Sequence, residues 1–463
     1  MCVITRLSRV LGVTLFLLLT AFVYGQTGSV RGFVYDSKTG EPVIFTNVYL
    51  EGTSYGIATD VNGYYSLTQV KPGSYQLTVY TIGYEKYQQA ITVEAGKIVN
   101  QKINLIPAAK DIGTVEISGE RQENKTDVKM SVAKITPKEI KSLPSVGGEP
   151  DIAQYMQVLP GVIFTGDQGG QLYVRGGSPI QNKVLLDGMT IYNPFHSIGL
   201  YSVFDTDIIR NADVYTGGFG AQYGGRISSV IDITTRDGNK NRLSGKVNAS
   251  PFGAKALLEG PLSKPKESGA SSSFILSARN SYLQQTSPVF FNYVNNNGEG
   301  LPFNFSDLYG KISLGSGNGS KVNFFGFNFT DRVRYQGISD LGWNNFGAGA
   351  NFVLVPAGNP VLIEGNFSYS DYRIGLNEPG LADRSSRING FNMGLDFTYY
   401  KGSNEITYGI QVLGFSTDFQ FFNGPGRAVS QKENTTELAG YFSYKLVSGL
   451  LVFEPSLRYH YYA

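Results

Sequence analysis

The sequence is nearly free of cysteine and histidine. Its 463 residues include one cysteine, Cys2, and two histidines, His196 and His460. A disulfide needs two cysteines, and structural zinc sites are built from cysteine and histidine. The chain therefore cannot form an internal disulfide or a thiolate zinc site, and it has no His-Glu-x-x-His motif. We expect no metal ion and no cofactor.

An excess of one charge and a long apolar run are also missing. Lysine and arginine total 39 residues against 37 acidic residues, so composition offers no electrostatic case for binding nucleic acid. After residue 25 no run of 18 apolar residues occurs, which excludes a membrane-spanning helix there. The 57 glycines, 30 tyrosines and 29 phenylalanines are instead typical of sheets with tight turns, as in membrane β-barrels.

Residues 1–25 have the pattern of a signal peptide. Arg6 and Arg9 precede an uncharged, mostly apolar run of 14 residues, Val10–Val23, and Gly25 supplies a small residue before the expected cleavage point. The run is too short to cross a bilayer as a helix, which argues against a membrane anchor. Cleavage would remove the only cysteine and leave 37 basic and 37 acidic residues.

Residues 26–106 predict a β-sandwich of seven short strands. Apolar and polar residues alternate between Tyr75 and Tyr80, which is the period of a half-buried strand. Asn62-Gly63 and Pro72-Gly73 suit tight turns between strands. The seven expected strands are 30–35, 43–50, 56–59, 64–67, 75–80, 89–93 and 99–105.

Three motifs of this segment resemble the carboxypeptidase-regulatory-like domain. They are Gly40-Glu41-Pro42, the run Thr59–Tyr65, and Lys71–Tyr75. The resemblance implies a structural or binding module and not a peptidase. Residues 107–127, which follow, are polar and charged and are interpreted as a linker.

Residues 128–237 predict a compact α+β domain. Thr136–Glu139 forms a capping box with proline at the first helical position, so a short helix is expected to begin there. A second helix is expected from Asp151 to Leu159, ending at Pro160-Gly161. Short apolar strands separated by glycines are expected at 171–175, 184–186, 208–215 and 229–234.

This segment resembles the plug domain of TonB-dependent outer-membrane receptors. Four stretches carry the resemblance, in the family's order: Tyr155–Val162, Leu172–Gly177, Val184–Met189 and Ala212–Thr235. The resemblance implies that Arg175 and Arg226 lie between plug and barrel wall and pair with acidic residues of the barrel. The alternative is that both are solvated surface arginines.

Residues 238–463 predict part of a transmembrane β-barrel. Alternating segments such as 391–399 and 451–461 place aromatic residues on one face and polar residues on the other. We expect about eleven strands, with longer external loops at 335–341 and 424–433. Barrels of this family have about 22 strands, so the sequence is interpreted as a fragment with the first half of a barrel.

The predicted fold class is therefore mainly β: an N-terminal seven-stranded sandwich, an α+β plug, and the first half of an antiparallel barrel. The resemblance implies a receptor in the Gram-negative outer membrane, with its N-terminal domain in the periplasm. Such a receptor binds an extracellular ligand and imports it with energy transmitted by TonB. The alternative is a surface receptor or adhesin without transport. An enzyme is not expected, because no catalytic residues are identified and no Gly-x-Ser-x-Gly elbow occurs.

The expected partners are TonB, outer-membrane lipid and a small or medium extracellular ligand whose class stays open. A TonB-contacting segment is expected within 111–118. Val115 and Ile117 alternate with polar residues there, which suits addition of this segment as a strand to a partner's sheet. The alternative is an ordinary linker. The candidate contact residues are Asp111, Thr114, Val115, Glu116 and Ile117.

Ligand contact is expected in an irregular aromatic loop after the Asp187-Gly188 hairpin. The expectation rests on the position of this loop after the hairpin and on its aromatic side chains. The alternative is that these side chains pack against the barrel wall. The candidates are Tyr192, Asn193, Phe195, His196 and Tyr201.

Overall fold

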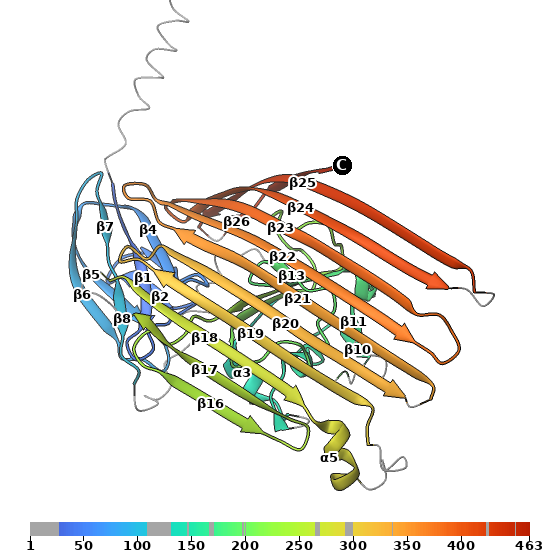
Figure 1. Ribbon diagram of the computed structural model, residues 1–463. Coiled ribbons are helices and arrows are strands. Elements are labelled where there is room, and N and C mark those ends of the chain that lie inside the picture. The colour runs from blue at the N-terminus through green and yellow to red at the C-terminus, as the bar shows by residue number, and fades with distance from the viewer. Residues whose placement is uncertain are drawn as a thin grey trace, which may run out of the picture.

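A computed structural model provides the structure of the chain. It describes residues 27–108, 131–145, 148–165, 171–196, 199, 201–263, 269–291, 300–335, 337–422, 426–449 and 451–463. The expected signal peptide therefore lies outside the described residues, as does most of the expected linker. Figure 1 shows a small domain at one end of a long curved sheet, with a third group of strands and short helices behind that sheet. Among the described residues, no helix is both long and apolar enough to cross a membrane.

The N-terminal domain has eight strand segments in two sheets. They are β1 (Gly28–Asp36), β2 (Asn47–Leu50), β3 (Gly56–Ala58), β4 (Tyr64–Val70), β5 (Gly73–Tyr80), β6 (Tyr87–Val93), β7 (Ile98–Asn100) and β8 (Ile103–Leu105). The sheets have the orders β4-β1-β7, with β8 also on β1, and β3-β2-β5-β6. Val30, Val48 and Leu77 are fully buried and belong to one apolar core.

Two expected strands of this domain differ in the structure. The strand expected at 99–105 is divided into β7 and β8, and both segments run parallel to β1. Between them, Gln101 N donates a 2.8 Å hydrogen bond to Arg31 O. The strand expected at 43–50 begins only at Asn47, because Phe45 has φ +53°, which an extended strand does not accommodate.

The plug region contains a mixed five-stranded sheet in the order β13-β12-β15-β14-β9. Its strands are β9 (Val132–Ile135), β12 (Asn182–Leu186), β13 (Met189–Thr190), β14 (Ile209–Tyr215) and β15 (Ser229–Thr235). Strand β12 runs parallel to β15, and the other pairs are antiparallel. The remaining elements are a two-stranded sheet of β10 (Val162–Thr165) and β11 (Gln171–Val174), the short 3-10 helix η2 (Pro179–Gln181), and helices α3 (Pro137–Ser142) and α4 (Ile152–Met156).

The expected helix starts of the plug are present, but one helix is shorter. The capping box forms at α3, where Thr136 N donates to Glu139 Oε2 at 2.6 Å. Asp151 caps α4 by accepting from Ala153 N at 2.8 Å. Helix α4 ends at Met156 instead of Leu159, and the chain continues in turns.

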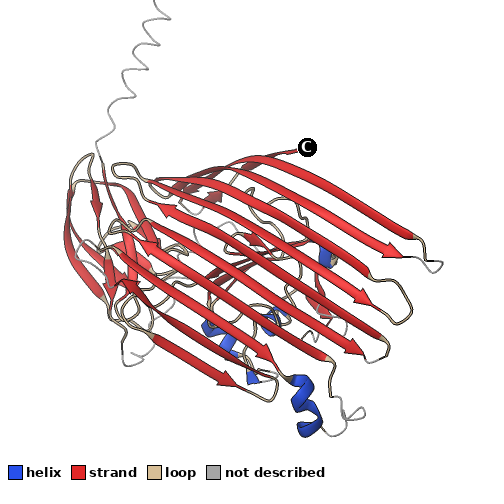
Figure 2. Ribbon diagram, viewed as in Figure 1, coloured by secondary structure: helices blue, strands red, loops and turns tan. Residues whose placement is uncertain are grey.

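The third part is one large antiparallel sheet. Its strands are β16 (Ser244–Ala249), β17 (Gly253–Ser263), β18 (Ser271–Ser281), β19 (Phe303–Gly315), β20 (Lys321–Tyr335), β21 (Ser339–Leu354), β22 (Val361–Asn377), β23 (Arg384–Lys401), β24 (Asn404–Phe422), β25 (Ala428–Ser448), β26 (Leu451–Phe453) and β27 (Ser456–Tyr462). Each strand from β16 to β25 pairs with the next, and β26 and β27 both pair with β25. These twelve segments thus fill eleven positions, in agreement with the predicted strand count. Figure 2 shows that the strands form one curved layer.

The two expected external loops are mostly strand. Strand β20 extends to Tyr335 and β21 begins at Ser339, and β25 begins at Ala428, so most residues of both expected loops belong to strands. The prediction of long loops was wrong here because polar strand ends that extend beyond the apolar part of a sheet look like loops in sequence. A longer connection at this end joins β18 to β19 and contains helix α5 (Leu283–Phe290).

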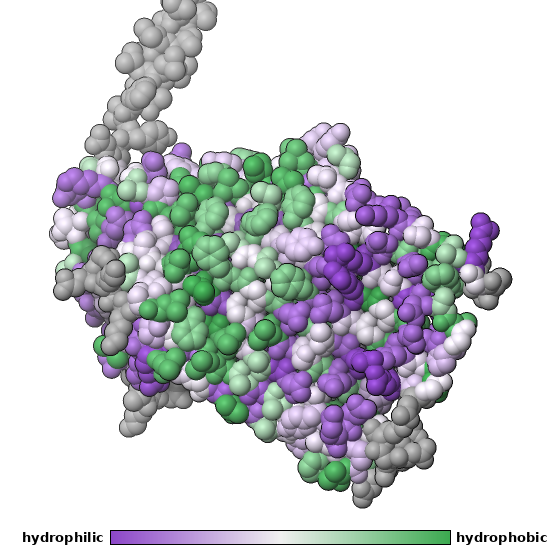
Figure 3. All heavy atoms as spheres, viewed as in Figure 1, coloured by the Kyte–Doolittle hydropathy of each residue, from purple (hydrophilic) through white to green (hydrophobic). Residues whose placement is uncertain are grey.

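The outward face of the sheet changes from apolar to polar along each long strand. On β22, outward-facing Phe367 and Tyr369 are followed by Asp371 and Arg373, toward the end away from the N-terminal domain. Figure 3 shows apolar side chains gathered on the half nearer that domain and polar ones beyond. At about 3.3 Å per residue, the 21 residues of β25 span roughly 70 Å, against an apolar band of roughly 25 Å in outer-membrane barrels. The strands therefore continue well past a lipid-facing belt.

Candidate functional site

The plug is held against the inward face of the sheet by buried ion pairs. Lys255 of β17 lies with its ammonium 2.9 Å from Asp207 Oδ2 and 3.0 Å from Asp205 Oδ1, and its side chain is 6 % exposed. The pKa of Asp207 is held well below its usual range: burial raises it, but hydrogen bonds from Lys141, Lys246 and Lys255 outweigh burial. This anchor is therefore ionised throughout the physiological pH range.

A second anchor joins the start of α4 to the sheet. The guanidinium of Arg279 on β18 lies 2.6 Å from Asp307 Oδ2 and 3.5 Å from Asp151 Oδ2. Asp151 also caps α4 and accepts a 3.0 Å hydrogen bond from Ser202 N. One carboxylate thus connects a helix, a plug loop and the barrel wall, and a buried guanidinium requires such partners.

The turn between β12 and β13 forms a third contact. Asp187 and Gly188 both have positive φ, +50° and +86°, as a tight hairpin requires. Asp187 Oδ2 accepts hydrogen bonds from Thr235 Oγ1 at 2.6 Å and from Tyr309 OH of β19 at 2.7 Å. Gly188 O accepts from Asn392 Nδ2 of β23 at 2.7 Å. The hairpin therefore touches widely separated strands of the sheet.

His196 lies at the centre of a buried cluster. Its Nδ1 is 3.0 Å from Asp331 Oδ2, its Nε2 is 3.1 Å from Asp307 Oδ2, and its ring stacks on Phe305 at 3.8 Å. Burial alone would lower the pKa of His196, but the carboxylates of Asp307 and Asp331 outweigh burial and raise it. The protonated ring can donate one N–H to each carboxylate. This residue is a bridge between the plug loop and strands β19 and β20.

Of the other four candidates of the aromatic loop, Phe195 packs inside the plug, with its ring 4.9 Å from that of Phe164. Phe195 and Tyr201 are buried, at 1 % and 4 % exposed, and Tyr201 packs 5.8 Å from Phe305. Tyr192 and Asn193 are partly exposed, and Tyr192 lies 6.5 Å from Tyr372 of β22. Packing against the wall, the alternative left open by the sequence, describes the contact of Tyr201 with Phe305. Ligand contact stays a prediction for this loop.

The two arginines expected to pair with barrel acids are exposed in this chain. Arg175 Nη2 donates to Ser131 Oγ at 2.7 Å, and Arg226 Nη1 donates to Gly225 O at 2.7 Å. Both of these contacts are within the plug region. The expected chemistry occurs at a residue that the sequence did not single out: Arg236, just after β15, lies 2.5 Å from Glu259 of β17.

The expected TonB-contacting residues Asp111, Thr114, Val115, Glu116 and Ile117 lie outside the described residues. Within the described part of the chain, no group of three or more histidine, cysteine or acidic side chains is arranged to hold a metal ion.

The sequence analysis missed the basic residues that anchor the plug: Lys255, Arg279 and Lys311. Each is a charged residue at an inward position of an alternating strand; Lys255 shares the inward face of β17 with Glu259, Lys311 shares that of β19 with Asp307, and Arg279 is the one inward charge of β18. An inward charge of this kind is a usable signal, because a charge that faces a packed interior needs a partner. Their partners in the plug are not readable, since they lie 48 or more residues away in the chain.

Comparison with known proteins agrees with these features. Residues 30–117 match the CarboxypepD_reg-like domain, and residues 124–230 match the TonB-dependent Receptor Plug Domain. The chain is 29 % identical over 238 residues to the TonB-dependent receptor SusC of Bacteroides thetaiotaomicron, covering 49 % of this chain and 23 % of SusC. It is 25 % identical over 283 residues to the TonB-dependent transporter Oar of Myxococcus xanthus, covering 57 % of this chain and 26 % of Oar. The chain thus spans about a quarter of these relatives' length.

Solved structures share the fold at low sequence identity. The FrpB iron transporter of Neisseria meningitidis matches 71 % of this chain and 57 % of its own, with a TM-score of 0.54 and 14 % identity. The siderophore receptor PirA of Pseudomonas aeruginosa matches 72 % of this chain and 56 % of its own, with a TM-score of 0.52 and 17 % identity. The relatives are receptors and transporters, not enzymes, and they imply an outer-membrane location. The described chain has the domain order and the fold of a TonB-dependent outer-membrane receptor.

Proposed function

We propose that this chain is part of an importer that carries an extracellular ligand into the periplasm with energy transmitted by TonB. The observation that carries the proposal is the buried set of ion pairs between plug and sheet. Lys255 and Arg279 are 6 % and 7 % exposed at their side chains, and each contacts plug carboxylates. A plug held in this way obstructs the space beside the sheet, so passage of a ligand requires these pairs to separate.

Separation of these buried ion pairs costs free energy, and we propose that an external source supplies it. Removing one partner of a buried pair costs about 3–5 kcal/mol, and the plug has several such pairs. Binding of a ligand alone would have to supply this energy and still permit release. A pulling force on a segment before the plug could supply the energy instead of ligand binding. Residues 111–118 precede β9 in the chain. We propose that TonB engages this segment from the periplasm.

The test is energy-dependent uptake in the native host. A strain that lacks the gene is compared with its parent for uptake of ferric siderophores, oligosaccharides and peptides, each carrying a radiolabel. The probe that depends on the gene is then measured with wild-type protein, with a variant lacking Thr114–Ile117, and with a protonophore. An importer loses uptake in both conditions while cells still bind the probe. Uptake that survives the deletion or the protonophore overturns the proposal.

The same assay separates import from the alternative. A surface receptor or adhesin would bind the probe at the cell surface, and no labelled probe would reach the periplasm in any strain. Partly exposed Tyr192 and Asn193 are the positions we propose for ligand contact, and their alanine variants are expected to weaken binding of the probe. Unchanged binding by both variants would remove this loop from the ligand site.

A further inference from the structure

The N-terminal domain is docked onto one end of the large sheet by side chains that reach into its turns. Arg31 of β1 is 2 % exposed, and its guanidinium donates to Pro356 O at 2.7 Å and to Asn359 O, both between β21 and β22. Asn62 Nδ2 donates to Glu364 Oε1 of β22 at 2.9 Å. A buried arginine whose guanidinium is hydrogen-bonded to backbone carbonyls of another part of the chain indicates a specific interface and not a chance contact.

This interface also has a small apolar core of its own. Phe33 and Tyr64 of the N-terminal domain pack with residues of β21, β22 and the turn between them, separately from the main core of either part. The Tyr64 ring lies 5.8 Å from the ring of Tyr400 on β23. The sheet residues of the cluster are Val353, Val355 and Leu362. The small size of this core favours a contact that can open without unfolding either side.

The plug takes part in the same interface through two arginines. Arg236 Nη1 lies 2.7 Å from Glu41 of the N-terminal domain and 2.5 Å from Glu259 of β17, and its Nε donates to Asp207 O at 2.7 Å. Arg210 of β14 donates to Val61 O at 3.2 Å. Displacement of the plug strands would therefore break contacts of the N-terminal domain at the same time.

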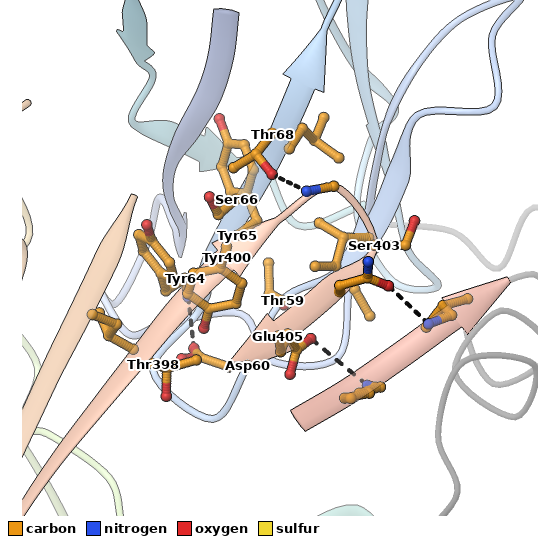
Figure 4. A pocket seen from close by; sticks show the side chains of 18 of the residues that line it. Thr59, Asp60, Tyr64, Tyr65, Ser66, Thr68, Thr398, Tyr400, Ser403 and Glu405 are labelled. Carbon is orange, nitrogen blue, oxygen red and sulfur yellow. Dashed lines mark hydrogen bonds and ion pairs between the residues drawn. The ribbon is translucent and has the colours of Figure 1, made fainter. Parts of the chain in front are cut away.

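A cavity of about 630 Å³ lies where the three parts meet, and all three line it. In Figure 4, Asp60 and Tyr64 of the N-terminal domain line this space together with Tyr400 and Glu405 of the sheet, and the rings of Tyr64 and Tyr400 lie beside each other. Lys134 of β9 is contributed by the plug. The volume is in the range of small-molecule sites, and the N-terminal domain forms one wall.

We propose that the N-terminal domain is a removable cap: it closes the end of the sheet that carries the β21–β22 and β23–β24 turns, and it undocks when the plug is displaced. The proposal rests on the proposed function, because the cavity behind the cap is then the exit chamber for the imported ligand. Arg236 couples the two movements, since it holds plug, cap and sheet together. Energy delivered to the plug would open the exit as well.

The experiment traps the docked cap with a disulfide. Asn62→Cys and Glu364→Cys place one thiol on each side of the interface, in a chain whose only other cysteine is Cys2. The matched control is Glu51→Cys with Lys86→Cys, whose native side chains lie 3.4 Å apart within the N-terminal domain. Full-length protein is oxidised in cells, and free thiols are counted with a maleimide polymer. Asn62→Cys alone and Glu364→Cys alone give the background level of maleimide labelling.

The expected result is a high disulfide yield for the interface pair in protonophore-treated cells and a several-fold lower yield in energised cells. The control pair is expected to give the same yield in both. Absence of the interface disulfide in both conditions, or an equal yield in both, overturns the cap. Glu41→Ala, which removes the cap's side-chain contact with Arg236, is expected to lower the interface yield in treated cells. The uptake assay tests the proposed function separately. If uptake depends on energy but the disulfide yield is the same in energised and treated cells, only the cap proposal is rejected.

Discussion

Replacement of Arg279 by glutamine is the sharpest test of how the plug is held. The guanidinium is bonded to Asp307 at 2.6 and 2.8 Å, lies 3.5 Å from Asp151, and also donates to Ser202 O. A matched control is Arg387→Gln on the outward face of the same sheet. Arg387 also holds a carboxylate with two hydrogen bonds, to Asp371 at 2.7 and 2.9 Å, but its side chain is 42 % exposed.

The two substitutions differ in expected cost because the two pairs differ in burial. Loss of a buried partner leaves an unpaired charge in the interior and costs about 3–5 kcal/mol. Asp307 keeps its 3.1 Å contact with His196, so we expect the lower end of that range for Arg279→Gln. Arg387 is exposed, and Asp371 keeps its 2.9 Å hydrogen bond from Arg373, so about 0–1 kcal/mol is expected at that site. About 3 kcal/mol corresponds to more than a 100-fold increase in the open population of the plug.

Amide hydrogen exchange of the full chain in detergent measures this population locally. The amides of α4 are expected to exchange more than 100-fold faster in Arg279→Gln, because Asp151, which caps α4, loses its partner on the sheet. Amides of the long strands β22–β24 serve as the internal reference. Equal effects of the two substitutions on α4 would show that burial does not set the strength of these pairs, and the reasoning would fail.

Three further outcomes are expected. Because the pKa of His196 is raised, its bridge to Asp307 and Asp331 stabilises the folded state at low pH, and this stabilisation is lost as pH rises through that pKa. In His196→Asn, this pH dependence of the free energy of unfolding should be absent. Gly188→Ala should cost about 1–3 kcal/mol by strain at φ +86°, and more than Gly337→Ala at φ +71°, because an added Cβ meets Asn366 at 3.2 Å only at the first position. Outward Leu276→Arg should destabilise the protein in lipid by about 2–4 kcal/mol, and Asn280→Arg, on the same face of β18 in the polar zone, by about 0–1 kcal/mol. Melting curves that rank either pair in the opposite order would contradict the assigned environments.

Much of the fold is readable from short stretches of the chain. The period of two along the strands predicts which side chains face the interior, and the number of strand positions follows from the same pattern. The capping box at Thr136 predicts the start of α3, and the Asp187-Gly188 turn predicts the hairpin of the plug. These features depend on interactions between residues a few positions apart, so local sequence is sufficient for them.

Boundaries were less predictable where backbone conformation overrides side-chain pattern. Phe45 is apolar and lies in an apolar run, yet its positive φ delays β2 to Asn47. The polar ends of β20 and β25 resemble loops in composition, yet they remain paired as strands beyond the apolar belt. Pairing with a neighbouring strand satisfies backbone groups whatever the side chain, so composition alone misplaces such ends.

The order of the parts, the resemblance to receptor plugs and the two faces of the sheet all follow from the amino-acid sequence. Which charges meet depends on tertiary packing. Lys255 reaches Asp205 across 50 residues, His196 reaches Asp331 across 135, and Arg31 reaches Pro356 across 325. The strand pattern shows that a side chain points inward, but the energy of a buried charge depends on what lies within a few ångströms of it. That distance is set by how plug, sheet and N-terminal domain pack together, and no local pattern encodes it.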